Sequence, residues 1–483
     1  MRRAWFLIAV AAVASACTAA PKAPTTVEAL DTTGTTVADG VDVPTTLVTL
    51  PDGSTPTVPG VPAPSAGPAA PGEPSPSSPG GTPAAPVPDD GFTSTLYQGA
   101  NDTAGITDDT ITICAHAALT YAAAFNTSPD DLNVYWNVVN EAGGVHGRRV
   151  EVFYENDDYK PDTAVQAATR CKQDHNPFIL IGGIGFDQIP AVRTWAENNE
   201  VLYIHHTATS HGADDLQHSW SFLPTTEVTG QMFGKLAVAR FRDRHFGIIK
   251  RGSENWEPGI RGFKAVTEPA GIDIRLEREV PQNKGSYVQD IVDMRNAGVD
   301  TVFLWINALE STQFITQADA QDWHPQFIVF PFNLTSQTLD EAALDPPLFG
   351  VSMHNAYTFG DHSGPFAAYA DDMKLFEQQY AQYRPNADIG GLGGDLLFLN
   401  WSGQKALHQL LLQCGADCTR NRFVEVLHGY KGRPTSSGCE VDFTRAGPGN
   451  SHRGGWQLSV MTTYTDPRGR VSWRNTDTCV ENV

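Results

Sequence analysis

The chain has 483 residues, of which 41 % are hydrophobic, and it carries a formal net charge of −22 at pH 7. This acidic balance disfavours nucleic acid and anionic lipid surfaces as partners. The length exceeds what one compact core usually holds, which predicts more than one lobe in the folded part of the chain.

Residues 1–17 have the composition of a lipoprotein signal peptide. Arg2 and Arg3 precede an apolar run, and small residues then lead to Cys17. The tetrapeptide Ala14-Ser15-Ala16-Cys17 resembles a bacterial lipobox, in which the cysteine is lipidated and becomes the new N-terminus. The alternative is an ordinary signal peptide with a chance cysteine. The lipobox interpretation predicts a lipid-anchored protein on the extracytoplasmic face of a bacterial cell membrane.

Residues 18–103 are rich in Pro, Thr, Ala, Gly and Ser, which predicts a disordered tether. Random-coil scaling predicts a root-mean-square end-to-end distance of roughly 50 Å for about seventy such residues. After Cys17 no stretch reaches about 18 consecutive apolar residues, so the sequence predicts no membrane-spanning helix and leaves the lipid as the anchor.

The folded part opens with a strand–helix–strand unit between Ile106 and Pro161. The apolar run 111–115 predicts a buried strand, and Ser128 with the following proline predicts a helix start. That helix carries an apolar stripe and ends at Gly143-Gly144, after which 149–154 predict a second strand. The crossover predicts a parallel sheet covered by helices, with the residues after 115 at a strand's carboxyl end, where such sheets bind ligands.

The same alternation continues to the end of the chain. Further strands are predicted at 178–181, 201–204, 246–250, 272–280, 301–306 and 327–330, and a hairpin at 456–464 and 471–474. Helices are predicted at 162–174, 189–196, 226–241, after Pro258, and at 286–296, 311–322, 365–383 and 391–413.

Six cysteines follow Cys17, and an even number in an exported domain indicates disulfide bonds. Six cysteines allow fifteen pairings, of which we favour Cys114–Cys171, Cys414–Cys418 and Cys439–Cys479. The second pair has the best support, because only three residues separate its cysteines where a helix stops.

Four short motifs carry a family resemblance. They are Gly105–Ile111, Asn140–Arg148, Asn156-Asp157-Asp158 with Pro161, and Ile181-Gly182-Gly183. In combination they resemble the type I periplasmic substrate-binding proteins of the leucine/isoleucine/valine-binding family, from Ile106 to the C-terminus. The resemblance implies an α/β fold of two doubly wound parallel-sheet lobes joined by three hinge crossings. It implies a first lobe of 104–224 plus 357–438 and a second of 225–356 plus 439–483.

The resemblance also implies ligand contacts from both lobes. Those of the first lobe are Leu119, Thr120, Tyr121, Gly183, Ile184, Gly185, Phe186, Asp187, Gln188, His206, Thr207, Ala208 and Thr209. Those of the second lobe are Trp256, Asn307 and Phe332. Free N–H groups at helix starts bind carboxylates, and aromatic side chains close over apolar ligand parts.

Two of the three anchors that amino-acid-binding members use are replaced. Phe186 stands where those members have the serine that holds the α-carboxylate, and Phe330–Asn333 replaces the acidic stretch that holds the ammonium. Thr209 is kept. We therefore expect a ligand other than a simple branched-chain amino acid, more apolar or amide-like, with a donor group facing Asp187. The alternative is that Asp187 only caps the helix that follows.

The sequence predicts no cofactor, no metal and no catalysis. His116, His205, His206, His211 and His218 invite a metal hypothesis, but adjacent histidines on a strand point to opposite faces and no HExxH pair occurs. No GxSxG elbow, P-loop or strand-borne GxGxxG is present either.

The sequence thus favours a monomeric solute-binding protein, not an enzyme. It would close on a small ligand by hinge motion and deliver it to the membrane permease of an ABC importer. The alternatives are a ligand sensor of the same fold that signals to a membrane partner, and a hydrolase.

Overall fold

The computed structural model describes residues 102–120, 128–182, 188–205, 218–222, 224–252, 256–281, 284–330, 339, 341–352, 367–389, 391–432, 439–445, 455–465, 469 and 471–481. The leader, Cys17 and nearly all of the tether lie outside these ranges, so they stay predictions. None of the helices within the described ranges combines the length and apolarity needed to cross a membrane.

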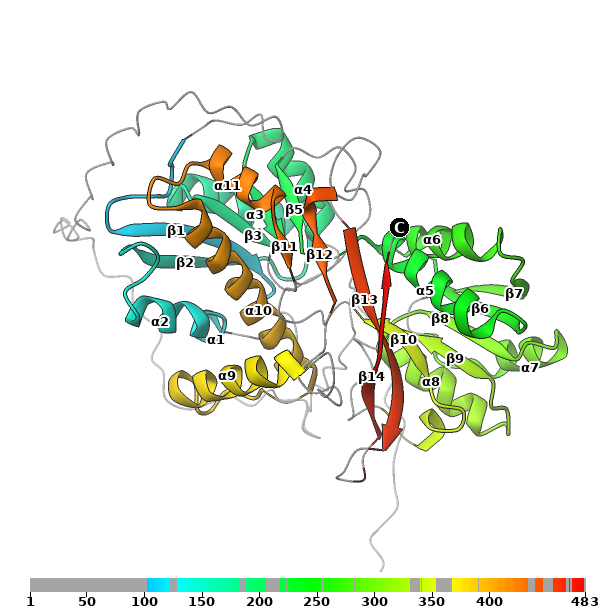
Figure 1. Ribbon diagram of the computed structural model, residues 1–483. Helices are drawn as coiled ribbons and strands as arrows, with labels where there is room; N and C mark the ends of the chain where they lie inside the picture. The colour runs from blue at the N-terminus through cyan, green and yellow to red at the C-terminus, as the bar shows by residue number, and fades with distance from the viewer. Residues whose placement is uncertain are drawn as a thin grey trace, which may run out of the picture. The chain divides into compact units, whose positions relative to one another are not determined.

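Within the described residues, five parallel strands form the first sheet (Figure 1). Their order is β2-β1-β3-β4-β5, made of β1 (Thr110–Ala117), β2 (Arg149–Asn156), β3 (Ile179–Gly182), β4 (Tyr203–His205) and β5 (Ser219–Ser221). The register pairs Ala117 with Asn156 and Gly182 with both His116 and His205. The carboxyl ends of four strands therefore meet at one edge.

The helices of this part are α1 (Pro129–Leu132), α2 (Val134–Glu141), α3 (Pro161–Arg170), α4 (Gln188–Asn199), α9 (Ala367–Tyr383), α10 (Gly391–Cys414) and α11 (Arg420–His428). A π-helical turn, Cys171–His175, continues α3. The apolar stripe predicted after Ser128 is confirmed, because Leu132, Tyr135, Trp136 and Val139 are all buried.

The single helix predicted after Ser128 is wrong in one respect: it is two helices, α1 and α2, separated at Asn133. The carbonyl oxygen of Leu132, at the break, accepts hydrogen bonds from Tyr154 Oη (3.2 Å), Asn400 Nδ2 (3.1 Å) and Gln404 Nε2 (2.7 Å). These side-chain donors satisfy a backbone oxygen that a continuous helix would have used internally.

The second sheet contains the predicted parallel strands, and antiparallel strands are added to it beyond β10. Its parallel part is β7 (Asp273–Val280), β6 (His245–Arg251), β8 (Thr301–Trp305), β9 (Gln326–Val329) and β10 (Phe349–Ser352). The predicted C-terminal hairpin, β13 (Gly455–Thr465) and β14 (Val471–Glu481), joins this sheet antiparallel to β10. Two short strands, β12 (Val441–Asp442) and β11 (Lys431–Gly432), extend the ladder from β13.

The helices that accompany the second sheet are α5 (Thr226–Phe241), α6 (Glu257–Thr267), α7 (Val288–Asn296) and α8 (Ala308–Asp319), with 3-10 turns at Glu341–Ala343 and Phe443–Arg445. Helix α5 has the predicted bounds, and Thr225 caps its start. It packs tightly on α6, because a Cβ at Gly230 would lie 1.9 Å from the carbonyl oxygen of Gly259.

The structure contains the three disulfides favoured from the sequence, and their pairing is confirmed. Cys114–Cys171 joins β1 to the end of α3, and both cysteines are fully buried. Cys414–Cys418 closes the short turn between α10 and α11, and Cys439–Cys479 joins the segment before β12 to β14.

Candidate functional site

The first candidate contact surface is the loop that follows β1. Leu119 N donates to Asn156 Oδ1 at 3.0 Å, and Thr120 Oγ1 donates to Asp158 Oδ1 at 2.8 Å. Asn156 Nδ2 in turn donates to Thr120 Oγ1 at 2.8 Å. Hydrogen bonds from Thr120 and Asn156 lower the pKa of Asp158. Thr120 is therefore exposed but held in place by the last residue of β2 and by the turn that follows it.

Beneath this loop lies a buried polar network. His116 Nδ1 is 2.8 Å from Asp157 Oδ2, and its Nε2 is 2.8 Å from Tyr203 Oη. All three side chains are buried. Burial raises the pKa of Tyr203 well above its usual value, so the hydroxyl stays protonated. With a neutral imidazole, Tyr203 donates to Nε2 and Nδ1–H donates to Asp157.

Asp157 joins this network to two further segments. Its Oδ1 accepts from Tyr159 N at 2.9 Å and from Gln188 Nε2 at 3.2 Å, and Gln188 is the first residue of α4. Gly182 is needed at the centre, since a Cβ there would lie 2.5 Å from Tyr203 Oη. The network thus ties together the ends of β1, β2, β3 and β4.

The second candidate surface lies at the carboxyl ends of β6 and β8. Trp305 Nε1 donates to the carbonyl oxygen of Trp256 at 2.7 Å, and the two rings meet edge to face with centroids 5.7 Å apart. Asn307 Oδ1 accepts from Glu310 N at 2.9 Å and caps α8. Two predicted contacts of the second lobe are therefore held in place: Asn307 by the start of α8, and Trp256 by its hydrogen bond with Trp305.

An ion pair at this second edge was not predicted from the sequence. Arg251, the last residue of β6, donates from Nη2 to Glu310 Oε1 at 2.9 Å, and its guanidinium carbon lies 5.8 Å from the centre of the Trp256 ring. The sequence did contain a signal for this ion pair: Arg251 is a charged residue at the carboxyl end of a buried strand, five positions before Trp256.

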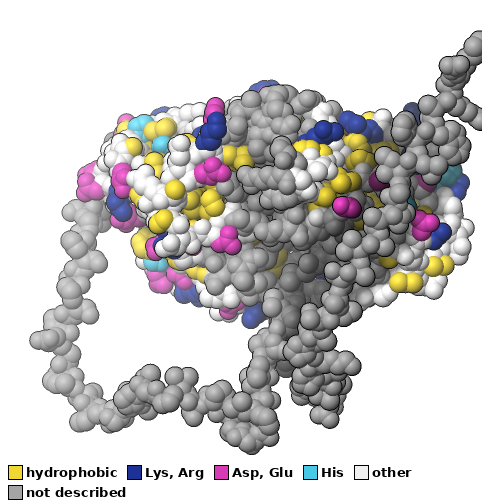
Figure 2. Space-filling model, turned by 90° about the horizontal axis from the view of Figure 1, so that it is seen from below, with side chains coloured by type: hydrophobic (Ala, Val, Ile, Leu, Met, Phe, Trp, Pro, Cys, Tyr) yellow, Lys and Arg dark blue, Asp and Glu magenta, His cyan; other side chains and the backbone are white. Residues whose placement is uncertain are grey.

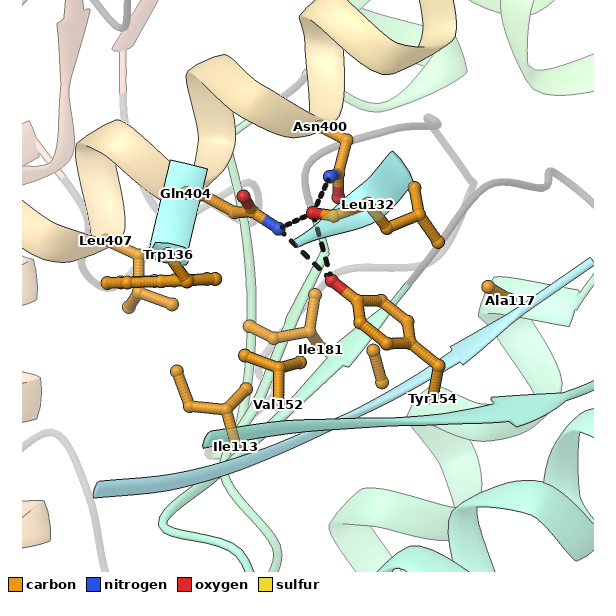
Figure 3. A pocket seen from close by; sticks show the side chains of 11 residues that line it. Ile113, Ala117, Leu132, Trp136, Val152, Tyr154, Ile181, Asn400, Gln404 and Leu407 are labelled. Atoms are coloured by element: carbon orange, nitrogen blue, oxygen red, sulfur yellow. Dashed lines mark hydrogen bonds between the residues drawn. The ribbon is translucent and has the colours of Figure 1, made fainter. Parts of the chain in front are cut away.

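A cavity in the first part of the chain lies between the sheet and α10, on the core side (Figure 3). Most of its lining is apolar, and it has room for about one water molecule. Its polar members, Tyr154, Asn400 and Gln404, are turned to the Leu132 carbonyl oxygen (Figure 3). A space of this size is a packing defect around the helix break, not a site for an organic ligand.

The remaining predicted contacts lie outside the described residues. They are Tyr121, Gly183, Ile184, Gly185, Phe186, Asp187, His206, Thr207, Ala208, Thr209 and Phe332. Among the described residues, no group of three or more His, Cys, Asp or Glu side chains could hold a metal ion. His205 is buried with its ring 5.6 Å from that of Tyr203. Among the side chains that Figure 2 shows, acidic and basic groups are interspersed.

Comparison with known proteins places this geometry in a family. The family model for periplasmic binding proteins matches residues 121–477. A leucine-, isoleucine-, valine-, threonine- and alanine-binding protein of Pseudomonas aeruginosa is 23 % identical over 167 residues, or 34 % of this chain. The matched segment spans 44 % of that relative, less than half its length.

Solved structures show the same fold at low sequence identity. An ABC transporter substrate-binding protein from Sphaerobacter thermophilus is 15 % identical with a TM-score of 0.62, covering 77 % of this chain and 98 % of that one. A solute-binding protein from Rhodopseudomonas palustris BisB5, in complex with 3,4-dihydroxy benzoic acid, is 14 % identical with a TM-score of 0.60, covering 77 % and 97 %.

A substrate-binding protein from Desulfitobacterium hafniense, complexed with leucine, is 13 % identical with a TM-score of 0.56, covering 76 % of this chain and 100 % of that one. These likenesses establish a type I periplasmic binding protein fold. Because the family model spans residues 121–477, well over half of the chain, the protein belongs to the periplasmic binding protein family.

Proposed function

We propose that this protein captures a small organic ligand outside the cytoplasm and delivers it, as a monomer, to the permease of an ABC importer. Its membership of the periplasmic binding protein family carries this proposal. The two sheet edges support it, because each presents polar or aromatic side chains that are already held in place by hydrogen bonds.

The ligand would be held between a first lobe of 104–224 plus 357–438 and a second lobe of 225–356 plus 439–483. Closure would follow a population shift, in which the ligand binds one lobe and contacts with the other stabilise the closed form. Thr120 would contact it from the first lobe and Trp256 from the second, with Phe186 in the position that selects against amino acids.

Among the amino-acid-, amide- and aromatic-acid-like ligands expected from the sequence, we favour a carboxylic acid. The two ligands named in the relatives above, 3,4-dihydroxy benzoic acid and leucine, share a carboxylate although they differ elsewhere. A thermal-shift screen of the purified chain with aromatic acids, fatty acids, amino acids and amides tests this, because a compound that binds the folded state raises its apparent stability. A screen in which no compound shifts the unfolding temperature contradicts the proposal.

Phe186→Ala should weaken binding of the best compound at least tenfold without lowering the yield of folded protein. The matched control is Phe153→Ala, since Phe153 lies on β2 with 38 % of its surface exposed and stacks on His175. Equal affinities in the two variants would show that Phe186 does not contact the ligand.

We further propose that Cys17 is lipidated and that residues 18–103 tether the lobes to the membrane. The lipobox resemblance and the composition of the tether support this. Cys17→Ala should move the protein from the membrane fraction to the soluble fraction, whereas continued membrane retention would contradict the lipid anchor.

A further inference from the structure

Arg251 is a nearly buried cation with few partners. It ends β6, and only 11 % of its side chain is exposed. Within the part of the chain that the structure describes, its one hydrogen bond runs from Nη2 to Glu310. Its Nε is fully buried, and none of the described residues accepts a hydrogen bond from it. A guanidinium has five N–H donors, and buried donors are normally satisfied.

Glu310 neutralises Arg251 but cannot satisfy all of these donors. Its side chain is 3 % exposed, and its second oxygen, Oε2, accepts from Asn307 N at 3.3 Å as part of the cap of α8. The carboxylate is thus held in place by the helix start. The Glu310 carboxylate therefore holds the Nη2 end of the Arg251 guanidinium. The Nε–H group of Arg251 remains available to a different acceptor.

Tyr287 provides a second buried donor near this pair. It is the N-cap residue of α7, its side chain is fully buried, and its hydroxyl has no hydrogen-bond partner among the residues that the structure describes. The Tyr287 ring lies 5.4 Å from that of Phe314, four residues after Glu310 on α8, which places Tyr287 beside the start of that helix. Burial raises the pKa of Tyr287, so its hydroxyl stays protonated. A protonated phenol with no acceptor costs free energy unless another molecule accepts from it.

We propose that Arg251 and Tyr287 form the carboxylate-binding subsite of this receptor, with Trp256 against the apolar part of the ligand. The ligand class is an organic monocarboxylate, whose oxygens accept from Arg251 Nε and Tyr287 Oη. This inference rests on the proposed function. It places the group that binds the ligand's carboxylate in the second sheet, in keeping with Phe186 at the position of the serine that holds the α-carboxylate in amino-acid-binding members.

The nearby charges are compatible with this assignment. Lys284 Nζ pairs with Asp290 at 2.6 Å and lies 5.7 Å from the centre of the Tyr287 ring. Arg251 with Glu310, and Lys284 with Asp290, together carry no net charge. Bringing one carboxylate to this group therefore adds a single negative charge beside two cations, one of which still has a free donor.

The test compares an isosteric pair of probes, benzoate and benzamide, by calorimetric titration of the whole chain. The wild type should bind benzoate at least tenfold more tightly than benzamide. Tyr287→Phe should lower benzoate affinity three- to tenfold and leave benzamide affinity unchanged. Because this substitution removes a hydroxyl that has no partner, it should not lower the unfolding temperature.

Arg251→Lys keeps the charge that pairs with Glu310 but removes the Nε donor, so it should reduce the preference for benzoate at least tenfold. The control is Arg278→Met on β7, whose guanidinium pairs with Asp293 at 3.0 Å and is 42 % exposed. This control should keep the wild-type preference.

The possible results distinguish a failure of the carboxylate subsite from a failure of the proposed function. A wild type that binds benzamide as well as benzoate, or variants that keep the preference for benzoate, would overturn the carboxylate subsite and leave a solute-binding protein. A wild type that binds neither probe, nor any compound of the wider screen, would overturn both.

Discussion

Nδ1 of His116 lies 2.8 Å from Oδ2 of Asp157, and the two side chains are 1 % and 0 % exposed. This contact joins β1 to the turn after β2, and it continues through Tyr203 to β4 and through Gln188 to α4. The loops proposed to hold the ligand therefore rest on one shared layer of buried hydrogen bonds. We expect that layer to be costly to disrupt.

Asp157→Ala should destabilise the protein by about 3 kcal/mol, because it strands a buried imidazole and removes the acceptor of Gln188 and of Tyr159 N. Urea unfolding monitored by tryptophan fluorescence measures the change. The control is Asp273→Ala, whose carboxylate pairs with His245 at 2.9 Å with 52 % of its side chain exposed. Similar losses in the two variants would mean that the buried layer contributes no more than a surface pair.

The disulfides should differ in how much each contributes to the free energy of unfolding. Cys114–Cys171 joins residues 57 apart and Cys414–Cys418 residues only 4 apart. Loop-closure entropy predicts a contribution of about 4 kcal/mol for the first bond and about 2 kcal/mol for the second. Paired Cys→Ala variants, unfolded in urea under non-reducing conditions, test this order. A larger loss at Cys414–Cys418 would contradict the entropic account.

Local sequence patterns were enough for most of the elements. Helix α5 was predicted with its observed bounds, because Thr225 caps it and a buried face runs along it. Strand β5 was missed, since Trp220 stands between two serines and the segment has no apolar run like that of β4. The break at Asn133 was missed because its cause is tertiary: Asn400 and Gln404 lie 268 and 272 residues from Leu132.

The same limit applies to the candidate site. The sequence places His116 and Tyr203 at strand ends, but they are 87 positions apart, and local patterns do not show that they share a hydrogen bond. The Arg251–Glu310 pair, 59 residues apart, was likewise invisible. The family resemblance suggested Trp256 and Asn307 as ligand contacts, and this assignment stays a prediction.

His408 should make stability depend on pH in the mildly acidic range. Burial lowers the pKa of His408, the nearby His146 lowers it further, and Nδ1 lies 3.0 Å from Tyr135 Oη. The folded state thus favours the neutral ring, and the unfolded state binds more protons below its own pKa of about 6.5. Stability should therefore fall as the pH drops from about 6.5 toward the folded-state pKa.

His408→Gln should make this decline less steep, with each pKa unit of difference worth about 1.4 kcal/mol. Urea midpoints at pH 7.5 and 5.5 measure the effect. His324→Gln is the control, because His324 is 43 % exposed and pairs with two surface carboxylates, Asp319 and Asp322. A decline that is equally steep in the wild type and in His408→Gln would assign the pH dependence to other groups.

We expect Trp256 to contribute mainly to ligand binding and Trp305 mainly to the stability of the fold. Trp305 is buried and donates to the Trp256 carbonyl at 2.7 Å, whereas Trp256 is only partly buried. Trp256→Ala should weaken binding of the best carboxylate at least tenfold with little change in unfolding temperature. Trp305→Phe should cost about 1 kcal/mol of stability from the lost hydrogen bond and weaken binding a few-fold, because Trp256 loses its support.

Calorimetric titration and urea unfolding of both variants separate the two effects. Trp195→Ala provides a match for Trp256, since Trp195 is also partly buried but lies on α4, in its second turn. It should leave binding unchanged. If Trp256→Ala binds the carboxylate as tightly as Trp195→Ala does, the aromatic wall of the site lies elsewhere than at the end of β6.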